Sequence, residues 1–223
     1  MLFRSDEVGT VIRYNAVYNI GSEGFTPHGI YFDDGASGQT VYGNIIMNCN
    51  GYGFLIGGGR NHTIYNNIII NCDQAFFYDE RSRVGAINPD FWFEHSREGL
   101  DMHQNLLASP WQSEAWQKAY PYMAEWSLDY SDTENPNFIA NPAGSRISSN
   151  IIISNKKNLG NIENSVQKYS DISGNIIYKF YAMESLFTDC KNGDYRLRDD
   201  ARVFSQIPDF ENIPLEEIGR ITK

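Results

Sequence analysis

The chain has 223 residues, of which 41% are hydrophobic and 14% aromatic. This composition excludes a disordered protein, because burying these side chains offsets the entropy lost on ordering. The formal net charge of −10 argues against nucleic acid as a partner, since an acidic surface repels phosphate backbones. No stretch approaches the roughly 18 apolar residues of a membrane span, so we also expect no membrane partner.

Five segments share one pattern, in which short β-branched runs flank an asparagine. The asparagines are 29, 23, 83 and 25 residues apart, and all these intervals except the 83 match one turn of a solenoid. The pattern is typical of strands, and the helices of ankyrin and tetratricopeptide repeats and the leucine spacing of leucine-rich repeats are missing. In chain order the segments are VIRYNAVYN (Asn15), TVYGNIIMN (Asn44), TIYNNIIIN (Asn67), RISSNIIIS (Asn150) and DISGNIIYK (Asn175).

The repeat predicts an all-β fold, a right-handed, single-stranded parallel β-helix. Each coil gives one strand to each of two or three parallel sheets, about 4.8 Å from the next coil. An asparagine at one bend of every coil can hydrogen-bond to the asparagines above and below it, forming an amide ladder. Cys49 and Cys72 fall at the same place in successive coils, where we expect stacked, reduced thiols rather than a disulfide.

We expect residues 1–223 to form a single β-helix domain that is the C-terminal part of a longer protein. Repeat-like sequence already begins by about Thr10, which leaves no room for a cap over the first coil. A signal peptide is expected in the part that precedes this chain, with an extracellular or periplasmic location.

A second set of segments lies in three consecutive coils, at residues 29–34 (GIYFDD), 53–58 (GFLIGG) and 75–80 (AFFYDE). Aligning their apolar residues places Asp33 over Gly57 and Gly57 over Asp79, with Asp34, Gly58 and Glu80 in the next column. The backbones of Asp33 and Asp79 are then about 9.6 Å apart, with a bare glycine step between them.

Two carboxyl groups facing each other across about 6.5 to 9.5 Å suit inverting glycoside hydrolysis. One donates a proton to the leaving oxygen, and the other deprotonates the attacking water. We therefore predict Asp33, Asp34 and Asp79 as catalytic residues. Each acid taken singly is more simply a turn residue, so the prediction depends on the three segments being in register.

Four further residues near these segments are predicted to bind substrate. Arg60 and Arg81 end their segments and can pair with the acids or with sugar hydroxyls, and Glu80 lies beside Arg81. His28 precedes the first segment and is expected near the same corner.

The repeat stops at about residues 82–144, which form an insertion rich in aromatic residues and carboxylates. The insertion is expected to be partly helical, with Ser113 as a helix N-cap and Pro121 as a break. Trp92 and Trp111 are predicted to stack on sugar rings. The alternative is that the aromatic residues form a small core that fixes the insertion to the helix. A tail at about residues 186–223 is expected to cover the end of the coil stack.

The segments GIYFDDGASGQTVYGNIIMNC, GFLIGGGRNHTIYNNIIINC and AFFYDERS resemble bacterial right-handed parallel β-helix proteins described as glycoside hydrolases or pectate-lyase-like proteins. The closing GDYRLRDDARVF is similar to the C-terminal end of those proteins. The resemblance implies catalytic aspartates at Asp33 or Asp34 and at Asp79. The chain departs from the expected D-x-R-G pattern at Ser82, which replaces the glycine.

The main prediction is a glycoside hydrolase that cleaves a polysaccharide as a monomer, without a cofactor or metal. One alternative is a polysaccharide lyase, in which Ca²⁺ or an arginine neutralises a uronate and the acids are calcium ligands. Against it, no lysine lies in the three coils that carry the acids, and Arg60, Arg81 and His28 are the nearby basic residues. The other alternative is a non-catalytic glycan-binding solenoid.

Overall fold

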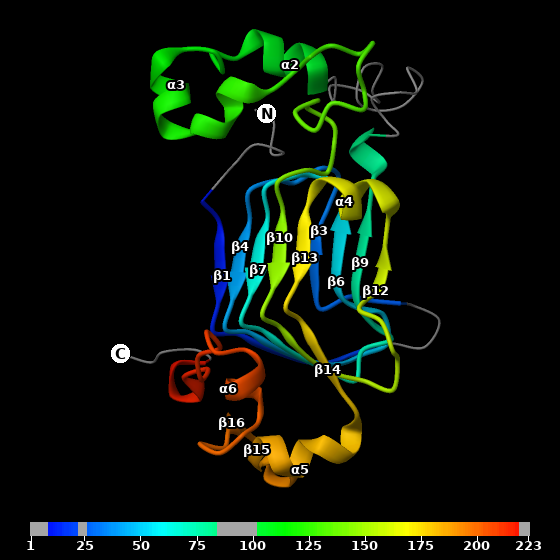
Figure 1. Cartoon of the computed structure of the whole chain (residues 1–223), viewed down its shortest axis with the longest axis vertical. Coiled ribbons are helices and arrows are strands. Elements are labelled where there is room, and N and C mark those ends of the chain that lie inside the picture. Colours follow the sequence, from blue (N-terminus) through cyan, green and yellow to red (C-terminus); the bar gives the residue numbers. More distant parts are fainter. Residues whose placement is uncertain (1–8, 22–25, 84–101, 219–223) are drawn as a thin grey trace.

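The structure is a computed structural model that describes residues 9–21, 26–83 and 102–218 (Figure 1). All strands of the coils lie in three sheets whose neighbouring strands are parallel, and β15 and β16 pair antiparallel in a separate two-stranded sheet. The first sheet contains β1 (Val11–Arg13), β4 (Thr40–Tyr42), β7 (Thr63–Tyr65), β10 (Arg146–Ser148) and β13 (Asp171–Ser173). The second contains β2 (Ala16–Ile20), β5 (Ile45–Cys49), β8 (Ile68–Ile70), β11 (Ile151–Ile153) and β14 (Ile176–Tyr178). The third contains β3 (Ile30–Phe32), β6 (Tyr52–Gly57), β9 (Gln74–Asp79) and β12 (Gly160–Ile162).

The first four coils visit the three sheets in turn and the fifth adds a strand to the first two sheets, so the predicted right-handed parallel β-helix is confirmed. The long interval in the repeat is also explained. Thr63 pairs directly with Arg146 and Ile68 with Ile151, so the coils on either side of the insertion are neighbours. Figure 1 shows the described part of the insertion, from residue 102 on, lying beyond the upper ends of the strands of the first and third sheets, outside the stack.

The predicted asparagine ladder runs along the bend between the first and second sheets. The side-chain amide of Asn67 donates to Asn150 Oδ1 at 2.9 Å, and Asn44 donates to Asn67 Oδ1 at 2.9 Å. The same contact joins Asn15 to Asn44 and Asn150 to Asn175. Each amide also donates to backbone carbonyls, which satisfies polar groups that the bend leaves unpaired.

The interior is filled by the inward-facing residues of all three sheets. Phe54 and Phe76 stack with ring centroids 5.1 Å apart, beside isoleucines from the other two sheets. Cys49 and Cys72 belong to this core and are both buried and free, as predicted.

The second sheet is apolar on both faces from β5 to β14, because each of these four strands carries consecutive isoleucines. Ile69 and Ile152 point into the helix, whereas Ile68 and Ile151 point out and pack against the C-terminal segment. This segment consists of η3 (Phe180–Ala182), α5 (Met183–Leu186), β15 (Phe187–Asp189), η4 (Cys190–Asn192), β16 (Asp194–Leu197), α6 (Val203–Gln206) and η5 (Leu215–Glu217).

The C-terminal segment therefore covers a side of the solenoid, and not the end of the stack that the sequence led us to expect. Figure 1 shows it below the strands, along the second sheet. The backbone of Glu211 exchanges two hydrogen bonds with the Asn66 side chain, which anchors the segment to the third coil. The physical reason is the outward row of isoleucines, which needs a cover along the length of the sheet.

The described part of the insertion contains α2 (Met102–Ala108), α3 (Glu114–Ala119) and η2 (Pro121–Glu125). The side chain of Ser113 caps α3 by accepting from the Trp116 N–H, and Pro121 begins η2, both as predicted. A further helix, α4 (Asn164–Tyr169), follows β12. None of the helices in the described ranges combines the length and the apolar character that crossing a bilayer requires.

Candidate active site

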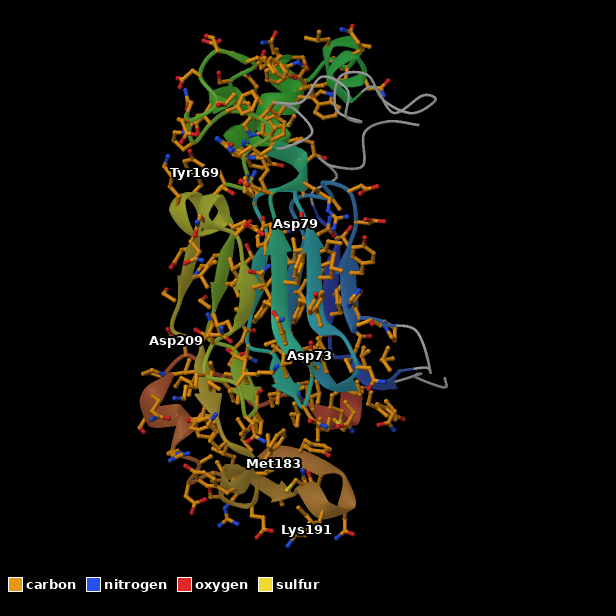
Figure 2. All side chains as sticks on the ribbon, turned by 90° about the vertical axis from the view of Figure 1, so that its right-hand side faces the viewer. Asp73, Asp79, Tyr169, Met183, Lys191 and Asp209 are labelled. Carbon is orange, nitrogen blue, oxygen red and sulfur yellow. The ribbon has the colours of Figure 1, made fainter. Side chains whose placement is uncertain are left out.

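The predicted register of Asp33, Gly57 and Asp79 is confirmed. Gly57 pairs with Asp79, and Phe32 pairs with Ile56, so that Asp33, the next residue, lies opposite Gly57. Because side chains alternate along a strand and the neighbours of these residues face the core, Asp33 and Asp79 share the outer face of the third sheet. Figure 2 shows Asp79 at the upper end of β9 on this face.

The glycine step between the acids is not empty, because the side chain of Arg81 lies over it. A Cβ atom placed on Gly57 would be 2.7 Å from Arg81 Cζ, closer than any ordinary contact. Arg81 Nη2 is 2.7 Å from Asp79 Oδ2, and Nη1 is 3.2 Å from Asp33 Oδ1 and 3.3 Å from Asp34 Oδ1. The missing side chain at Gly57 therefore makes room for a guanidinium that joins acids two coils apart.

This cluster of Asp33, Asp34, Asp79 and Arg81, called here the acid cluster, carries two more negative than positive charges. Burial lowers the pKa of Arg81, but hydrogen bonds and charge interactions with Asp79 and Tyr31 outweigh burial and raise that pKa above its ordinary value. Arg81 is therefore a fixed cation.

Tyr31 extends the acid cluster along the strand. Its hydroxyl donates to Asp33 Oδ1 and accepts from Arg81 Nη1 at 3.3 Å. Burial and the hydrogen bond to Asp33 raise the pKa of Tyr31, so its proton stays on the oxygen at neutral pH.

Asp34 does not form a column with Gly58 and Glu80, contrary to the sequence alignment. The Gly35 N–H donates to Gly57 O at 2.7 Å, which places Gly35 beside Gly58 and leaves Asp34 as an extra, bulged residue. Its φ of 40° is left-handed, a conformation that aspartate tolerates better than most residues. The bulge turns Asp34 outward, so that its side chain is 64% exposed.

Ser82 and Glu80 have structural contacts on the third coil. Ser82 Oγ accepts from the Gly59 N–H at 3.2 Å, so the residue that departs from the D-x-R-G pattern joins two coils. Glu80 lies 3.7 Å from Arg83, which also pairs with Glu134 in the turn-rich segment that leads back from the insertion. The structure therefore directs Glu80 toward the insertion, away from the acid cluster.

His28 lies at the opposite end of the third sheet from Asp33. It accepts from the Tyr52 N–H at 3.2 Å, and its ring stacks on Tyr52 with centroids 4.9 Å apart. Tyr52 in turn stacks on Phe77 at 4.8 Å. Burial lowers the pKa of His28, which keeps the ring neutral at pH 7. We call His28, Tyr52 and Phe77 the aromatic stack, and Tyr31 joins it to the acid cluster by an edge contact with His28 at 5.9 Å.

Arg60 and Trp111 are buried by the insertion, where they cannot meet a polysaccharide. Arg60 is only 6% exposed, donates to Phe138 O at 3.0 Å and lies 5.4 Å from the Trp126 ring. Trp111 is 5% exposed and packs in the same aromatic core. The alternative prediction, a small core that fixes the insertion, therefore describes these two residues. Trp92 lies outside the described residues.

One further acid lies in register with the acid cluster and was not predicted. Glu163 follows β12, and its N–H donates to Tyr78 O at 3.0 Å, which places it beside Asp79 on the neighbouring coil. No repeat motif marks this position, and 84 residues separate it from Asp79 in the sequence. Only the direct pairing of the coils around the insertion brings the two together.

The carboxylates near Arg81 are the oxygen ligands that a hard cation would use. Both carboxylate oxygens of Asp79 accept hydrogen bonds from Arg81. Asp33 Oδ1 accepts hydrogen bonds from Tyr31, Arg81 and the Asp34 N–H. Within the described ranges, no three histidine, cysteine, aspartate or glutamate side chains are grouped so as to hold a metal ion.

Part of the chain matches a known protein family. Residues 3–91 match the family model described as a right handed beta helix region. A search of curated proteins and a search of solved structures each found no match. The fold and this match define the class of protein as a right-handed parallel β-helix. Such a fold fits a carbohydrate-active solenoid, and proteins of the β-helix family include polysaccharide-degrading enzymes.

Proposed function

We propose that this protein is a glycoside hydrolase that cleaves a polysaccharide with two carboxylates on the outer face of the third sheet. The observation that carries the proposal is the acid cluster, in which Asp33 and Asp34 on one coil face Asp79 two coils away across Gly57. Structural ion pairs also occur on β-helices, but here they lie on the outer sheet face beside the exposed ring of Tyr31 and the half-buried rings of Tyr52 and Phe77.

The contacts of the cluster suggest how the roles divide. Asp79 is bound by Nε and Nη2 of Arg81 and is 18% exposed, so it is the charged carboxylate that would activate water. Asp34 has a single side-chain contact, from Arg81 Nη1, and it faces solvent, so the leaving oxygen of a substrate could reach it, and we assign it the role of proton donor. Sugar hydroxyls would replace the Nη1 contacts, while Nε and Nη2 stay with Asp79.

The lyase alternative fits these contacts less well. β-Elimination needs a base, and the raised pKa of Arg81 makes it a poor one. Three carboxylates around one guanidinium would also repel a uronate unless a cation were added.

A non-catalytic glycan-binding protein is favoured by one observation, that Arg81 occupies the space between the acids. In such a protein the acid cluster would only join coils. Glycan affinity would then survive neutralisation of the acids, and no product would form.

The test is digestion of a panel of polysaccharides with the full-length gene product, with the released anomer followed by proton NMR. Asp79→Asn, Asp33→Asn and Asp34→Asn should each abolish turnover and leave the unfolding transition in place. Asp171→Asn on the first sheet, an exposed acid 4.0 Å from Arg146, is the matched control and should keep full activity. Full activity in all three cluster variants would exclude the assignment. An unsaturated product that absorbs in the ultraviolet and disappears with a chelator would favour the lyase.

A further inference from the structure

A groove with a volume of about 420 Å³ opens at the corner where the second sheet turns into the third. We propose that this corner groove is a distal binding site for a neutral glycan chain whose other end reaches the acid cluster. The inference rests on the proposed function and adds the substrate class and the direction in which the chain lies. The lining includes Asn48, Asn50, Asn71, Asp73, Lys156 and Phe180.

The polar groups of the corner groove suit sugar hydroxyls. Asn50 and Asn155 make no side-chain hydrogen bond to the residues that the structure describes, although amides both donate and accept. Asp73 and Lys156 lie 3.4 Å apart and are about half exposed, so each keeps hydrogen-bonding capacity toward solvent. Phe180 adds an apolar wall, as is usual in sites that bind a ligand with a hydrophobic face.

A structural role accounts for only part of this lining. Asn48 and Asn71 adopt left-handed φ values of 55° and 53°, and Asn71 donates to Asn48 at 2.8 Å, so these two form a second, exposed ladder at the bend. Asn50, Asp73 and Asn155 have no part in that ladder. They give the groove polar capacity that the fold does not need.

The charges select a neutral ligand. One acid and one base line the corner groove, whereas the acid cluster has an excess of negative charge and the whole chain has a formal net charge of −10. A polyuronate would meet repulsion at the acid cluster, and the one cation of the groove, Lys156, is already paired with Asp73.

Strand β9 joins the two places. Asp73 immediately precedes β9 and Asp79 ends it, and Figure 2 shows the two residues at opposite ends of the strand on the face toward the viewer. Six residues of strand span about 20 Å, which is the length of several sugar units. The half-buried rings of Tyr52 and Phe77 lie on this face between the ends, where sugar rings could stack on them. A glycan lying along β9 would therefore touch the corner groove, the aromatic stack and the acid cluster in turn.

The experiment is titration calorimetry with cellohexaose, xylohexaose and mannohexaose, their disaccharides, and hexagalacturonate as the charged probe. All proteins carry Asp79→Asn so that no probe is consumed. The groove variant is Asp73→Ala with Lys156→Ala, which removes an exposed ion pair of little value to stability. The matched control removes the exposed pair Glu184 and Lys191 in the C-terminal segment. A second groove variant, Asn50→Trp, fills the space without changing charge.

At least one neutral hexasaccharide should bind about tenfold more tightly than its disaccharide, and both groove variants should remove about that factor while the control does not. Unchanged hexasaccharide affinity in the groove variants would overturn the proposal, as would binding of hexagalacturonate alone or of none of the hexasaccharides. The proposed function fails differently: a hexasaccharide would bind through the groove, yet the protein with native Asp79 would not cleave it.

Discussion

Two columns of side chains run from coil to coil, and the same stacking builds both. In the asparagine ladder every coil supplies the same residue, because an amide donates on one side and accepts on the other. The outward column of the third sheet reads Asp33, Gly57, Asp79 and Glu163 and does not repeat. Carboxylates only accept and repel one another, so a stack of acids needs a gap and a cation, which Gly57 and Arg81 supply. Repetition therefore marks the scaffold, and departure from repetition marks the candidate site.

The largest effect is expected from breaking the ladder at its centre. Asn67 is fully buried, and its amide contacts Asn150, Asn44 and two backbone carbonyls. Asn67→Ala should lower the free energy of unfolding by about 3 kcal/mol or more, because several buried groups lose their partners. Urea denaturation measures this change. Asn175→Ala, at the partly exposed end of the ladder, should lower the free energy of unfolding clearly less. Equal losses in the two variants would mean that burial does not determine how much each asparagine stabilises the fold.

The next largest effect is a pH dependence of the free energy of unfolding, which arises in the core behind the outward column of the third sheet. His62 is fully buried against Phe32 and Tyr78, and burial lowers its pKa from 6.5 to about 4. Between pH 6.5 and about 4, the imidazole of His62 binds a proton in the unfolded chain but not in the folded chain. The contribution of the neutral, buried His62 to stability is therefore complete above pH 6.5 and is lost as the pH falls toward 4. The loss should reach at most about 3 kcal/mol.

Unfolding free energies measured from pH 7.5 to 4 test this prediction. His62→Gln removes the titrating ring, so the variant should show a smaller change over the same range. A variant that loses stability with the same slope would assign the pH dependence to other groups.

A smaller effect tests why the outward column contains a glycine. Gly57→Ala places a methyl group 2.7 Å from Arg81 Cζ and should displace the guanidinium, at a cost of about 1–2 kcal/mol. It should also reduce turnover of any substrate found. In an Arg81→Ala background the same change should cost almost nothing, which a double-mutant cycle would measure. Equal costs in both backgrounds would show that Gly57 is required for another reason.

The smallest effect is expected in the exposed ladder beside the corner groove. Asn48 accepts from Asn71 and donates to Asn19 at 3.1 Å in contact with solvent. Asn48→Gly keeps the left-handed bend and should change stability by about 0.5 kcal/mol or less, since water replaces the lost contacts. A loss as large as that of Asn67→Ala would remove the distinction between the inner and outer ladders.

Much of the fold could be predicted because its signals are local and repeated. Asn44 and Asn67 lie 23 residues apart in nearly identical segments, so the register of β4 with β7 follows from counting. The pairing of Gly57 with Asp79, which are 22 residues apart, follows instead from aligning the apolar residues of their two segments. The alignment of the first segment failed immediately after Asp33. A bulge there makes Asp34 an extra residue, which the pattern of apolar residues does not show.

The sequence by itself determined the β-helix, the amide ladder and the position of two facing acids, since each depends on a period that stacking imposes on every coil. The tertiary structure alone decided that Arg81 fills the glycine step, that Glu163 joins the column from beyond the insertion, and that the C-terminal segment covers the second sheet. Those outcomes depend on where one side chain reaches or one segment docks, and contacts made once leave no period in the sequence.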